Sequence, residues 1–128
     1  MTEPKWVGLR SVLQIHRRVI ARFGGIESIR SEELLESALS RPLNRWHYVE
    51  PDVFDLAAAY AYGLAMNHPF VDGNKRTAFV TAVLFIERNG FRFIAPEQES
   101  ASKFISLAAG EISEAEIARW LKKCSTPA

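Results

Sequence analysis

The sequence predicts an all-α protein: a single domain in which five to six helices pack around a buried central helix. Apolar residues recur at three- and four-residue steps along most of the chain, which is the spacing of one helix face. The 128 residues are 48% hydrophobic and 24% charged, which suits one globular domain with its own core. Neither a repeat nor a linker-like stretch divides residues 1–128, so we expect one domain.

The first two helices are recognised by their ends. The first is expected over residues 9–23, because apolar positions are periodic there and Gly24-Gly25 supplies a C-terminal stop. The second is expected to begin after Ser31, with two glutamates in its first turn, and to end near Ser40, because Pro42 closes it. The polar face of the first helix is basic, and we expect it to be solvated; its arginines are Arg10, Arg17, Arg18 and Arg22.

Two apolar helices follow. Asp52 can cap the third helix, which ends before His68. A fourth helix is expected from about Asn74 to Asn89-Gly90, a strong C-capping pair. Its interior, residues 78–86, is apolar on nearly all sides, so we expect this helix to be the buried one at the centre.

The end of the chain contains a short extended segment and the remaining helices. Residues 91–94 alternate in polarity, which is typical of an extended segment. Pro96 opens a fifth helix, which Gly110 ends. Ser113, with Glu116 three residues later, matches a capping box and opens a last helix.

The composition excludes several classes of function. The formal net charge is only +1, so the protein does not hold a polyanion by bulk charge, and a ribonuclease is disfavoured. A small, local phosphate site remains compatible with this balance. The single cysteine, Cys124, excludes an intramolecular disulfide and a zinc site built from cysteines, and it fits a reducing compartment. No apolar run approaches the roughly 20 residues that cross a bilayer, so we expect a cytoplasmic protein.

One segment, residues 68–77, concentrates the side chains that can do chemistry. Pro69 disfavours helical geometry at His68, so His68 lies at a helix C-terminus. Gly73 permits a tight turn, and Lys75 and Arg76 then fall in the first turn of the next helix. The first N–H groups of a helix lack partners and attract anions. The segment therefore predicts a phosphate site.

The two cations support this interpretation because the positive end of a helix dipole normally favours acids. Asp72, the one nearby carboxylate, could hold Mg²⁺ together with substrate phosphates, and His68 could act as a general base. Each feature alone also has an ordinary explanation: a capping histidine, an Asp-Gly turn, and a solvated Lys-Arg pair. The P-loop pattern does not fit, because no Ser or Thr directly follows Lys75.

The segment His68-Pro-Phe-Val-Asp-Gly-Asn-Lys-Arg76 resembles the signature of the Fic/Doc family, whose general form is H-P-F-x-[D/E]-G-N-G-R. Lys75 stands where other members have the second glycine, which is typical of the Doc ("death on curing") branch. Gly24-Gly25, residues 109–113 and the chain length also look like Doc. The sequence thus resembles the Doc-like toxins of toxin–antitoxin pairs.

The resemblance implies a helical Fic core that uses ATP and Mg²⁺. It implies that His68 is the catalytic base for a target hydroxyl, that Asp72 holds the metal, and that Phe70 anchors the loop in the core. The residues that would bind ATP are Gly73, Asn74, Lys75 and Arg76.

The resemblance leaves the transferred group open. Typical Fic enzymes transfer AMP to a hydroxyl side chain, whereas Doc-like members are associated with transfer of the terminal phosphate, with elongation factor Tu as the target. Two departures favour phosphate transfer as a hypothesis: Phe79 replaces a frequent second arginine, and Lys75 adds a charged side chain beside the phosphates. AMP transfer is the alternative, and a non-catalytic module that only binds an antitoxin is another.

The resemblance also bears on regulation. Many Fic proteins inhibit themselves with a segment of the form [ST]-x-x-x-E-[GN], but this sequence has no Glu-Gly or Glu-Asn pair. We therefore expect a separate antitoxin with a segment that folds on binding. Trp6, Trp46 and Tyr48 are candidates for its groove, against the alternative of core burial. Whether a flap at residues 41–50 positions the substrate is left open.

Overall fold

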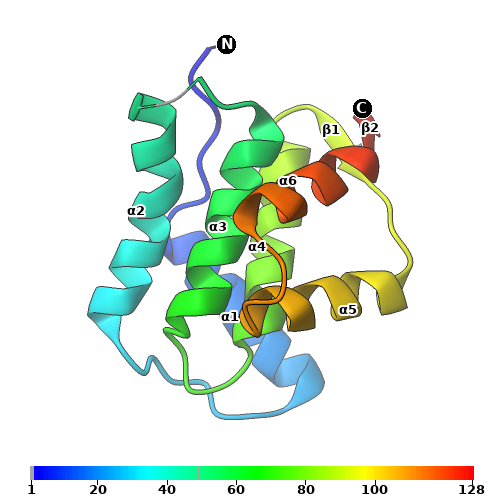
Figure 1. Cartoon of the computed structure of the whole chain (residues 1–128). Coiled ribbons are helices and arrows are strands. Elements are labelled where there is room, and N and C mark those ends of the chain that lie inside the picture. Colours follow the sequence, from blue (N-terminus) through cyan, green and yellow to red (C-terminus); the bar gives the residue numbers. More distant parts are fainter. Residues whose placement is uncertain (1, 49) are drawn as a thin grey trace.

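The computed structural model describes residues 2–48 and 50–128, and it confirms the all-α prediction. The described residues are 67% helical and form six helices and one small two-stranded sheet (Figure 1). Within these residues, every helix falls short of the length and apolarity that a bilayer-spanning segment needs. The elements are α1 (Leu9–Phe23), α2 (Glu32–Tyr48), α3 (Val53–Asn67), α4 (Asn74–Arg88), β1 (Phe91–Phe93), α5 (Glu97–Ala108), α6 (Glu114–Lys123) and β2 (Ser125–Pro127).

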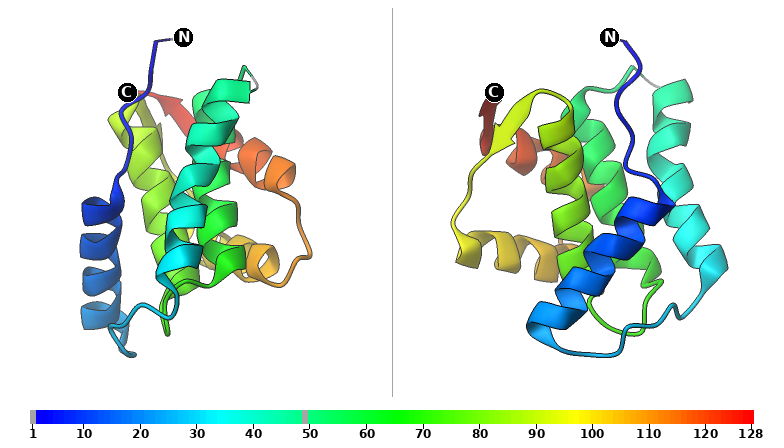
Figure 2. Two further views of the ribbon diagram at one scale, coloured as in Figure 1. Left: turned by 90° about the vertical axis from the view of Figure 1, so that its left-hand side faces the viewer. Right: turned by 180° about the vertical axis from the view of Figure 1, so that it is seen from behind.

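The helix at the centre is α3, which packs against α2, α4, α5 and α6, while α1 lies behind α4 in Figure 1 and in front of it in the view from behind (Figure 2). Most residues of α3 are buried, whereas α4, the helix expected at the centre, exposes Arg76 and Val80. The alanines at residues 57–59 explain the difference, because small side chains let neighbouring helices approach from several sides. The approach of α2 is closest at Gly63, where a Cβ would lie 3.0 Å from the carbonyl oxygen of Ala38.

The second helix is longer than the sequence predicts. It continues through Pro42 to Tyr48, so the prediction that it ends near Ser40 is wrong. Pro42 is buried, and it lacks the N–H that would bond the carbonyl of Ala38. That carbonyl faces Gly63 of α3. The packing of α2 on α3 therefore offsets the local cost of the proline.

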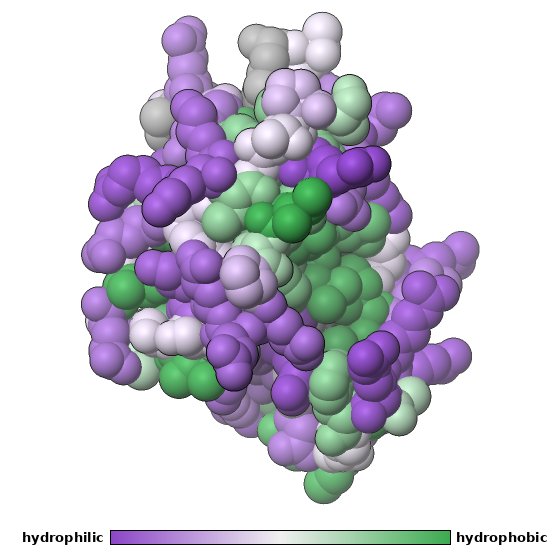
Figure 3. All heavy atoms as spheres, turned by 90° about the vertical axis from the view of Figure 1, so that its right-hand side faces the viewer, coloured by the Kyte–Doolittle hydropathy of each residue, from purple (hydrophilic) through white to green (hydrophobic). Residues whose placement is uncertain are grey.

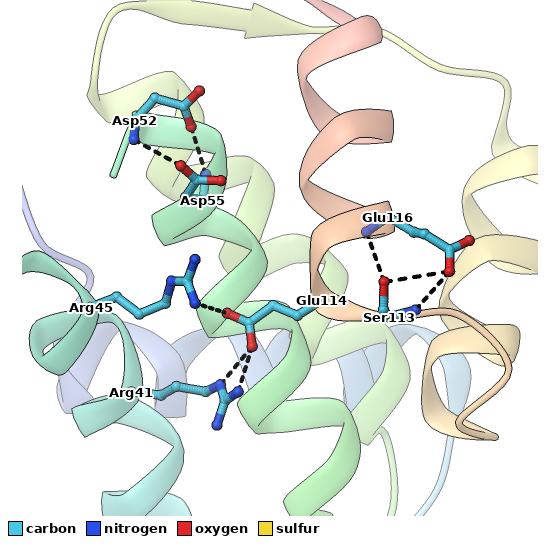
Figure 4. Close-up of polar contacts among 7 residues, drawn as sticks. All are labelled: Arg41, Arg45, Asp52, Asp55, Ser113, Glu114 and Glu116. Atoms are coloured by element: carbon cyan, nitrogen blue, oxygen red, sulfur yellow. Dashed lines mark hydrogen bonds and ion pairs between the residues drawn. The ribbon is translucent and has the colours of Figure 1, made fainter. Parts of the chain in front are cut away.

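An ion-pair cluster joins α2 to α6 (Figure 4). The carboxylate of Glu114 accepts a hydrogen bond from Nε of Arg41 at 2.9 Å and lies 3.6 Å from Nη1 of Arg45. The Arg41 guanidinium also lies 4.5 Å from the centre of the Tyr62 ring in α3. The C-terminal half of α2 is thus held against both α3 and α6.

Two helices begin with capping boxes (Figure 4). The box at Ser113 was predicted, whereas at Asp52 only the cap itself was. Asp52 accepts the N–H of Asp55 at 2.8 Å, and the Asp55 carboxylate accepts the N–H of Asp52 at 3.0 Å. Ser113 and Glu116 form the same reciprocal arrangement at the start of α6. These caps satisfy N–H groups that have no partner within the helix.

The expected extended segment is β1, but its partner was not predicted. β2, close to the end of the chain, pairs with it in antiparallel fashion, with Arg92 opposite Thr126. A segment this short carries too little periodicity to be recognised from the sequence.

Both chain ends are tied to one turn. Asn89 exchanges two hydrogen bonds with the backbone of Lys5, at 2.8 and 3.0 Å, and Gly90 accepts the N–H of Ala128 at 3.0 Å. The two termini consequently lie at one end of the molecule, and the α3–α4 connection lies at the other (Figures 1 and 2).

The N-terminal segment is also tied to the core through Tyr60 of α3. The Tyr60 hydroxyl donates to the carbonyl of Val7 and accepts its N–H, both at 3.0 Å. Burial raises the pKa of Tyr60 to about 12, because an anion there would lose its hydration.

Candidate functional site

The loop that the sequence singles out joins α3 to α4; we call residues 68–73 the motif loop. Phe70 is fully buried beneath it, and its ring stacks on the imidazole of His16 in α1, with centroids 3.8 Å apart and planes at 10°. The prediction that Phe70 anchors the loop in the core is confirmed. The motif loop is therefore fixed against α1 as well as between α3 and α4.

His68 follows the last turn of α3, as Pro69 predicts. It has a left-handed conformation, with φ 52° and ψ 55°, and it is the only non-glycine residue with positive φ in the described ranges. Its side chain is exposed, and the imidazole has no hydrogen-bond partner among the residues that the structure describes. It is thus available to a group from outside.

Asp72 is half-buried and is oriented by the loop that follows α1. One carboxylate oxygen, Oδ2, accepts the N–H of Ile26 at 2.7 Å, and the carbonyl of Asp72 is hydrogen-bonded to Nε2 of His16 at 2.8 Å. Gly25 packs directly on the carboxylate: a Cβ there would lie 2.9 Å from Cβ of Asp72. The second oxygen, Oδ1, has no partner within residues 2–48 and 50–128, so it can bind a ligand.

Gly73 and Asn74 form the start of α4. Gly73 is the N-cap residue with φ 81°, a conformation that favours glycine. We expected Asn74 to be among the residues that bind ATP. Its side chain is instead buried and occupied by the backbone of Phe70, to which it donates and from which it accepts a hydrogen bond, each 2.9 Å long. What Asn74 can offer an anion is its backbone N–H.

The start of α4 has the properties of an anion site. It has no side-chain cap and no acid in its first turn. The N–H groups of residues 74–76 therefore have no partner within the helix, and the side chains of Lys75 and Arg76 are exposed beside them. We call this start of α4, with those two side chains, the anion site. Such an arrangement binds phosphate through amides, dipole and charge together.

The arrangement fits magnesium bound together with a nucleotide. Mg²⁺ is usually held by one or two carboxylates, substrate phosphates and water. Asp72 supplies one carboxylate directly before the anion site. The described residues contain no cluster of three or more His, Cys, Asp or Glu side chains that could hold a metal ion by itself. The donor set therefore fits a metal that arrives with phosphates.

Several residues at the site escaped the sequence analysis. Phe23, the last residue of α1, lies against the Arg76 guanidinium, with 3.8 Å to the ring centre. Arg30 bonds the carbonyl of His68 at 2.7 Å. His16 offered a signal, because a buried histidine on the apolar face of a helix needs a hydrogen-bond partner. Phe23 and Arg30 offered none, since their roles depend on how the chain folds back.

The region considered for a flap lies elsewhere. Residues 41–48 belong to α2, and Arg45 lines a cavity of about 450 Å³ with Asp55 and Glu114. None of the motif residues borders this cavity. Residue 49, within the range considered for the flap, lies outside the described residues.

The aromatic residues considered for an antitoxin groove divide between core and surface. Trp6 and Trp46 are partly buried and meet edge to face, with centroids 6.3 Å apart. Tyr48 is 86% exposed. Core packing thus accounts for the two tryptophans but not for Tyr48.

Comparison with known proteins gives one family and several relatives. A model of the Fic/DOC family matches residues 6–86. The "Protein kinase doc" of Escherichia phage P1 is 34% identical over 113 residues, which cover 88% of this chain and 89% of the phage protein.

Two further relatives are informative. The "Toxin Doc" of Mycolicibacterium smegmatis is 43% identical over 75 residues, covering 57% of this chain and 58% of that protein. The "Protein adenylyltransferase fic-1" of Caenorhabditis briggsae is 27% identical over 126 residues, covering 84% of this chain but only 25% of that protein. Similarity thus extends to proteins named as a kinase, a toxin and an adenylyltransferase.

Proposed function

We propose that this chain, which belongs to the Fic/DOC family, is a Doc-like toxin. The proposed reaction transfers the γ-phosphate of ATP to a hydroxyl side chain of a protein target. We further propose that the target is elongation factor Tu and that the modification inhibits translation in the cytoplasm. A transferase named a protein kinase, similar over nearly the whole chain, supports the reaction class.

The observation that carries the proposal is the convergence of three functions on one short connection. His68 is exposed and has no protein partner for its imidazole, Asp72 keeps one carboxylate oxygen open, and the anion site follows directly. A base, a metal ligand and a phosphate site are the parts that phosphoryl transfer to a hydroxyl needs.

In the proposed reaction, His68 accepts the proton of the target hydroxyl as its oxygen attacks the γ-phosphorus. The bond between that phosphorus and the β–γ bridging oxygen breaks, and ADP leaves. The N–H groups of the anion site and the side chains of Lys75 and Arg76 would bind phosphate oxygens. Asp72 would hold Mg²⁺, which when bound offsets phosphate charge.

Phosphate transfer is favoured over AMP transfer by two side chains of α4. Phe79 stands at the position of a frequent second arginine and packs among aromatic rings. Its ring centroid lies 5.8 Å from that of Phe93 and 5.3 Å from that of Phe104. It therefore supplies no cation to the nucleotide. Lys75 adds a charge that a glycine would lack. Both differences change how a triphosphate can be held.

The test uses purified elongation factor Tu and ATP labelled at either the α- or the γ-phosphate. The proposal predicts that the γ label, and not the α label, appears on the target. Transfer of the α label would establish the AMP transferase instead. If the wild-type protein binds its antitoxin but transfers neither label to any protein, it is a non-catalytic module.

A separate antitoxin is part of the proposal. The name of the mycobacterial relative includes the word toxin, and the inhibitory [ST]-x-x-x-E-[GN] pattern is missing from this sequence. The face in Figure 3 has a hollow where apolar side chains gather between hydrophilic margins, and such a face suits the apolar stripe of a segment that folds on binding. Co-expression with the product of the neighbouring reading frame should abolish toxicity.

A further inference from the structure

The loop between α1 and α2 runs alongside the motif loop; we call residues 24–31 the bracing loop. The backbone N–H of Arg30 donates to the carbonyl of Pro69 at 2.7 Å, and the N–H of Val71 donates to the carbonyl of Ser28 at 3.0 Å. The two loops are therefore paired like short antiparallel strands. The main chain next to His68 is thus bonded directly to the bracing loop.

The side chain of Arg30 reaches further, to the end of α3. Its Nε donates to the carbonyl of His68 at 2.7 Å, and its Nη2 donates to the carbonyl of Asn67 at 2.9 Å. The last carbonyls of a helix lack partners within it and lie at the negative end of its dipole, so a cation stabilises them. The planar guanidinium can bond both carbonyls at once, which an ammonium cannot do with the same geometry.

The conformation of His68 makes these bonds important. A residue other than glycine is strained in the left-handed region, and such strain persists only where the surroundings impose it. The imidazole of His68 has no hydrogen-bond partner among the described residues, so its direction depends on the main chain beneath it. Arg30 bonds the carbonyl groups that precede and follow the His68 Cα, namely those of Asn67 and of His68 itself.

We propose that Arg30 is a positioning residue: by bonding the carbonyls of Asn67 and His68, it holds His68 in the left-handed conformation from which the imidazole meets the target hydroxyl. The catalytic part of this inference rests on the proposed function. Arg30 itself touches no reacting atom. A helix cap without this role would stabilise the fold but would leave the turnover of the folded enzyme unchanged.

The test compares three substitutions. Arg30→Met keeps an unbranched, flexible side chain and removes its donors, and Arg30→Lys keeps the charge. The matched control is Arg17→Gln, which removes another exposed arginine that contacts the bracing loop, through Glu27 at 3.5 Å, without bonding the motif loop. Thermal unfolding and circular dichroism establish that each variant is folded.

We expect Arg30→Met to lower kcat about 10- to 100-fold, the cost of a misplaced reacting group, with the KM for ATP changed less than about twofold. Arg30→Lys should recover part of the loss, and Arg17→Gln should match the wild type. Wild-type kcat in folded Arg30→Met overturns the proposal. If Arg30→Met does not fold, Arg30→Lys decides: a kcat reduced about threefold or more supports the role, and a wild-type kcat overturns it.

A second measurement does not depend on activity. Nuclear magnetic resonance of ¹⁵N-labelled protein should show a changed backbone amide shift for His68 in Arg30→Met and an unchanged one in Arg17→Gln. An unchanged His68 signal in Arg30→Met overturns the positioning role even if the enzyme is a kinase. Absence of any transfer by the wild type would instead overturn the proposed function, so the two failures are distinguishable.

Discussion

The guanidinium of Arg76 lies 3.8 Å from the centre of the Phe23 ring, so the last residue of α1 supports a cation in the first turn of α4. The guanidinium of Arg22 lies 5.4 Å from the same ring. One exposed aromatic side chain therefore holds two positive charges near the anion site. A side chain arranged before the anion arrives loses less freedom on binding, which favours affinity.

Phe23→Ala should weaken ATP binding, because Arg76 loses the ring on which it lies. A cation–π contact at an exposed site contributes about 0.5–1 kcal/mol, so the KM for ATP should rise about two- to fivefold. Phe23→Tyr keeps the ring and serves as the control. Steady-state kinetics at varied ATP concentration measures the effect. An unchanged KM in Phe23→Ala would show that the contact between Phe23 and Arg76 does not contribute to ATP binding.

His68→Ala should lower the transfer rate by about 10²- to 10⁴-fold, the usual contribution of a general base, and should abolish toxicity. Folding should be retained, because the side chain is exposed and bonds no described residue. His68→Asn is a useful companion, since asparagine tolerates the left-handed conformation but cannot act as the base. Growth assays and label transfer test both variants. Full toxicity of His68→Ala would contradict the catalytic account.

Asp72→Asn should raise the Mg²⁺ concentration needed for half-maximal activity by about tenfold or more. The substitution keeps an oxygen that can accept the N–H of Ile26, so the loop should keep its shape while the charge is lost. Glu27→Gln, which removes an exposed acid from the bracing loop, is the control. The measurement is a Mg²⁺ titration at fixed ATP. Equal requirements in Asp72→Asn and the wild type would exclude Asp72 as the ligand.

Gly25→Ala and Gly24→Ala form a matched pair. Both glycines have positive φ, so either alanine should cost about 1–2 kcal/mol of stability. Only a Cβ at Gly25 meets Asp72, at 2.9 Å; at Gly24 nothing lies within 4 Å. We therefore expect a larger loss in denaturant unfolding for Gly25→Ala than for Gly24→Ala, and reduced transfer only in Gly25→Ala. Equal activity in the two variants would show that this close contact does not position Asp72.

Stability should fall above pH 10 because of Tyr60. Its pKa is raised from 10.0 to about 12, so the unfolded chain loses this proton first as the pH rises. The contribution of neutral Tyr60 to stability is complete below pH 10 and is lost as the pH rises towards 12. The free energy of unfolding should fall by about 2–3 kcal/mol over this range. Tyr60→Phe lacks this pH-dependent contribution to the free energy of unfolding, although it also loses the hydrogen bonds to Val7. Parallel pH curves for the two proteins would contradict the prediction.

Most of the helices could be predicted from local signals. The caps at Asp52 and Ser113 act within one turn, and Gly24 ends α1 through its own conformation. The end of α2 was wrongly predicted at Pro42. The cost of a proline, a lost helical hydrogen bond, can be read from the sequence, but the packing of α2 on α3 that offsets it involves residues distant in the sequence. The identity of the central helix was missed for a related reason. The prediction followed the apolar run of α4, whereas α3 is the more apolar helix and its small alanines admit neighbouring helices on several sides.

The site divides in the same way. The positions of His68, Asp72 and Arg76 around one connection follow from their spacing along the chain. The contacts that hold these residues in place come from α1 and the bracing loop, through His16, Phe23 and Arg30. No sequence pattern next to the motif predicts these contacts. The side chain of Asn74 holds the loop through the backbone of Phe70, a contact that no pattern in the sequence indicates. That Asn74 binds ATP, through its backbone N–H, stays a prediction.

The turn at Asn89 and Gly90, which ties residues 5 and 128 together, has a practical consequence. Lys5 and Ala128 lie on the side of the molecule opposite to the α3–α4 connection (Figure 1). A handle fused to either end could tether the protein to a sensor surface and leave His68 facing the solution. The same closeness of the ends favours a circularly permuted chain, in which a short linker joins them and new ends are opened in an exposed loop.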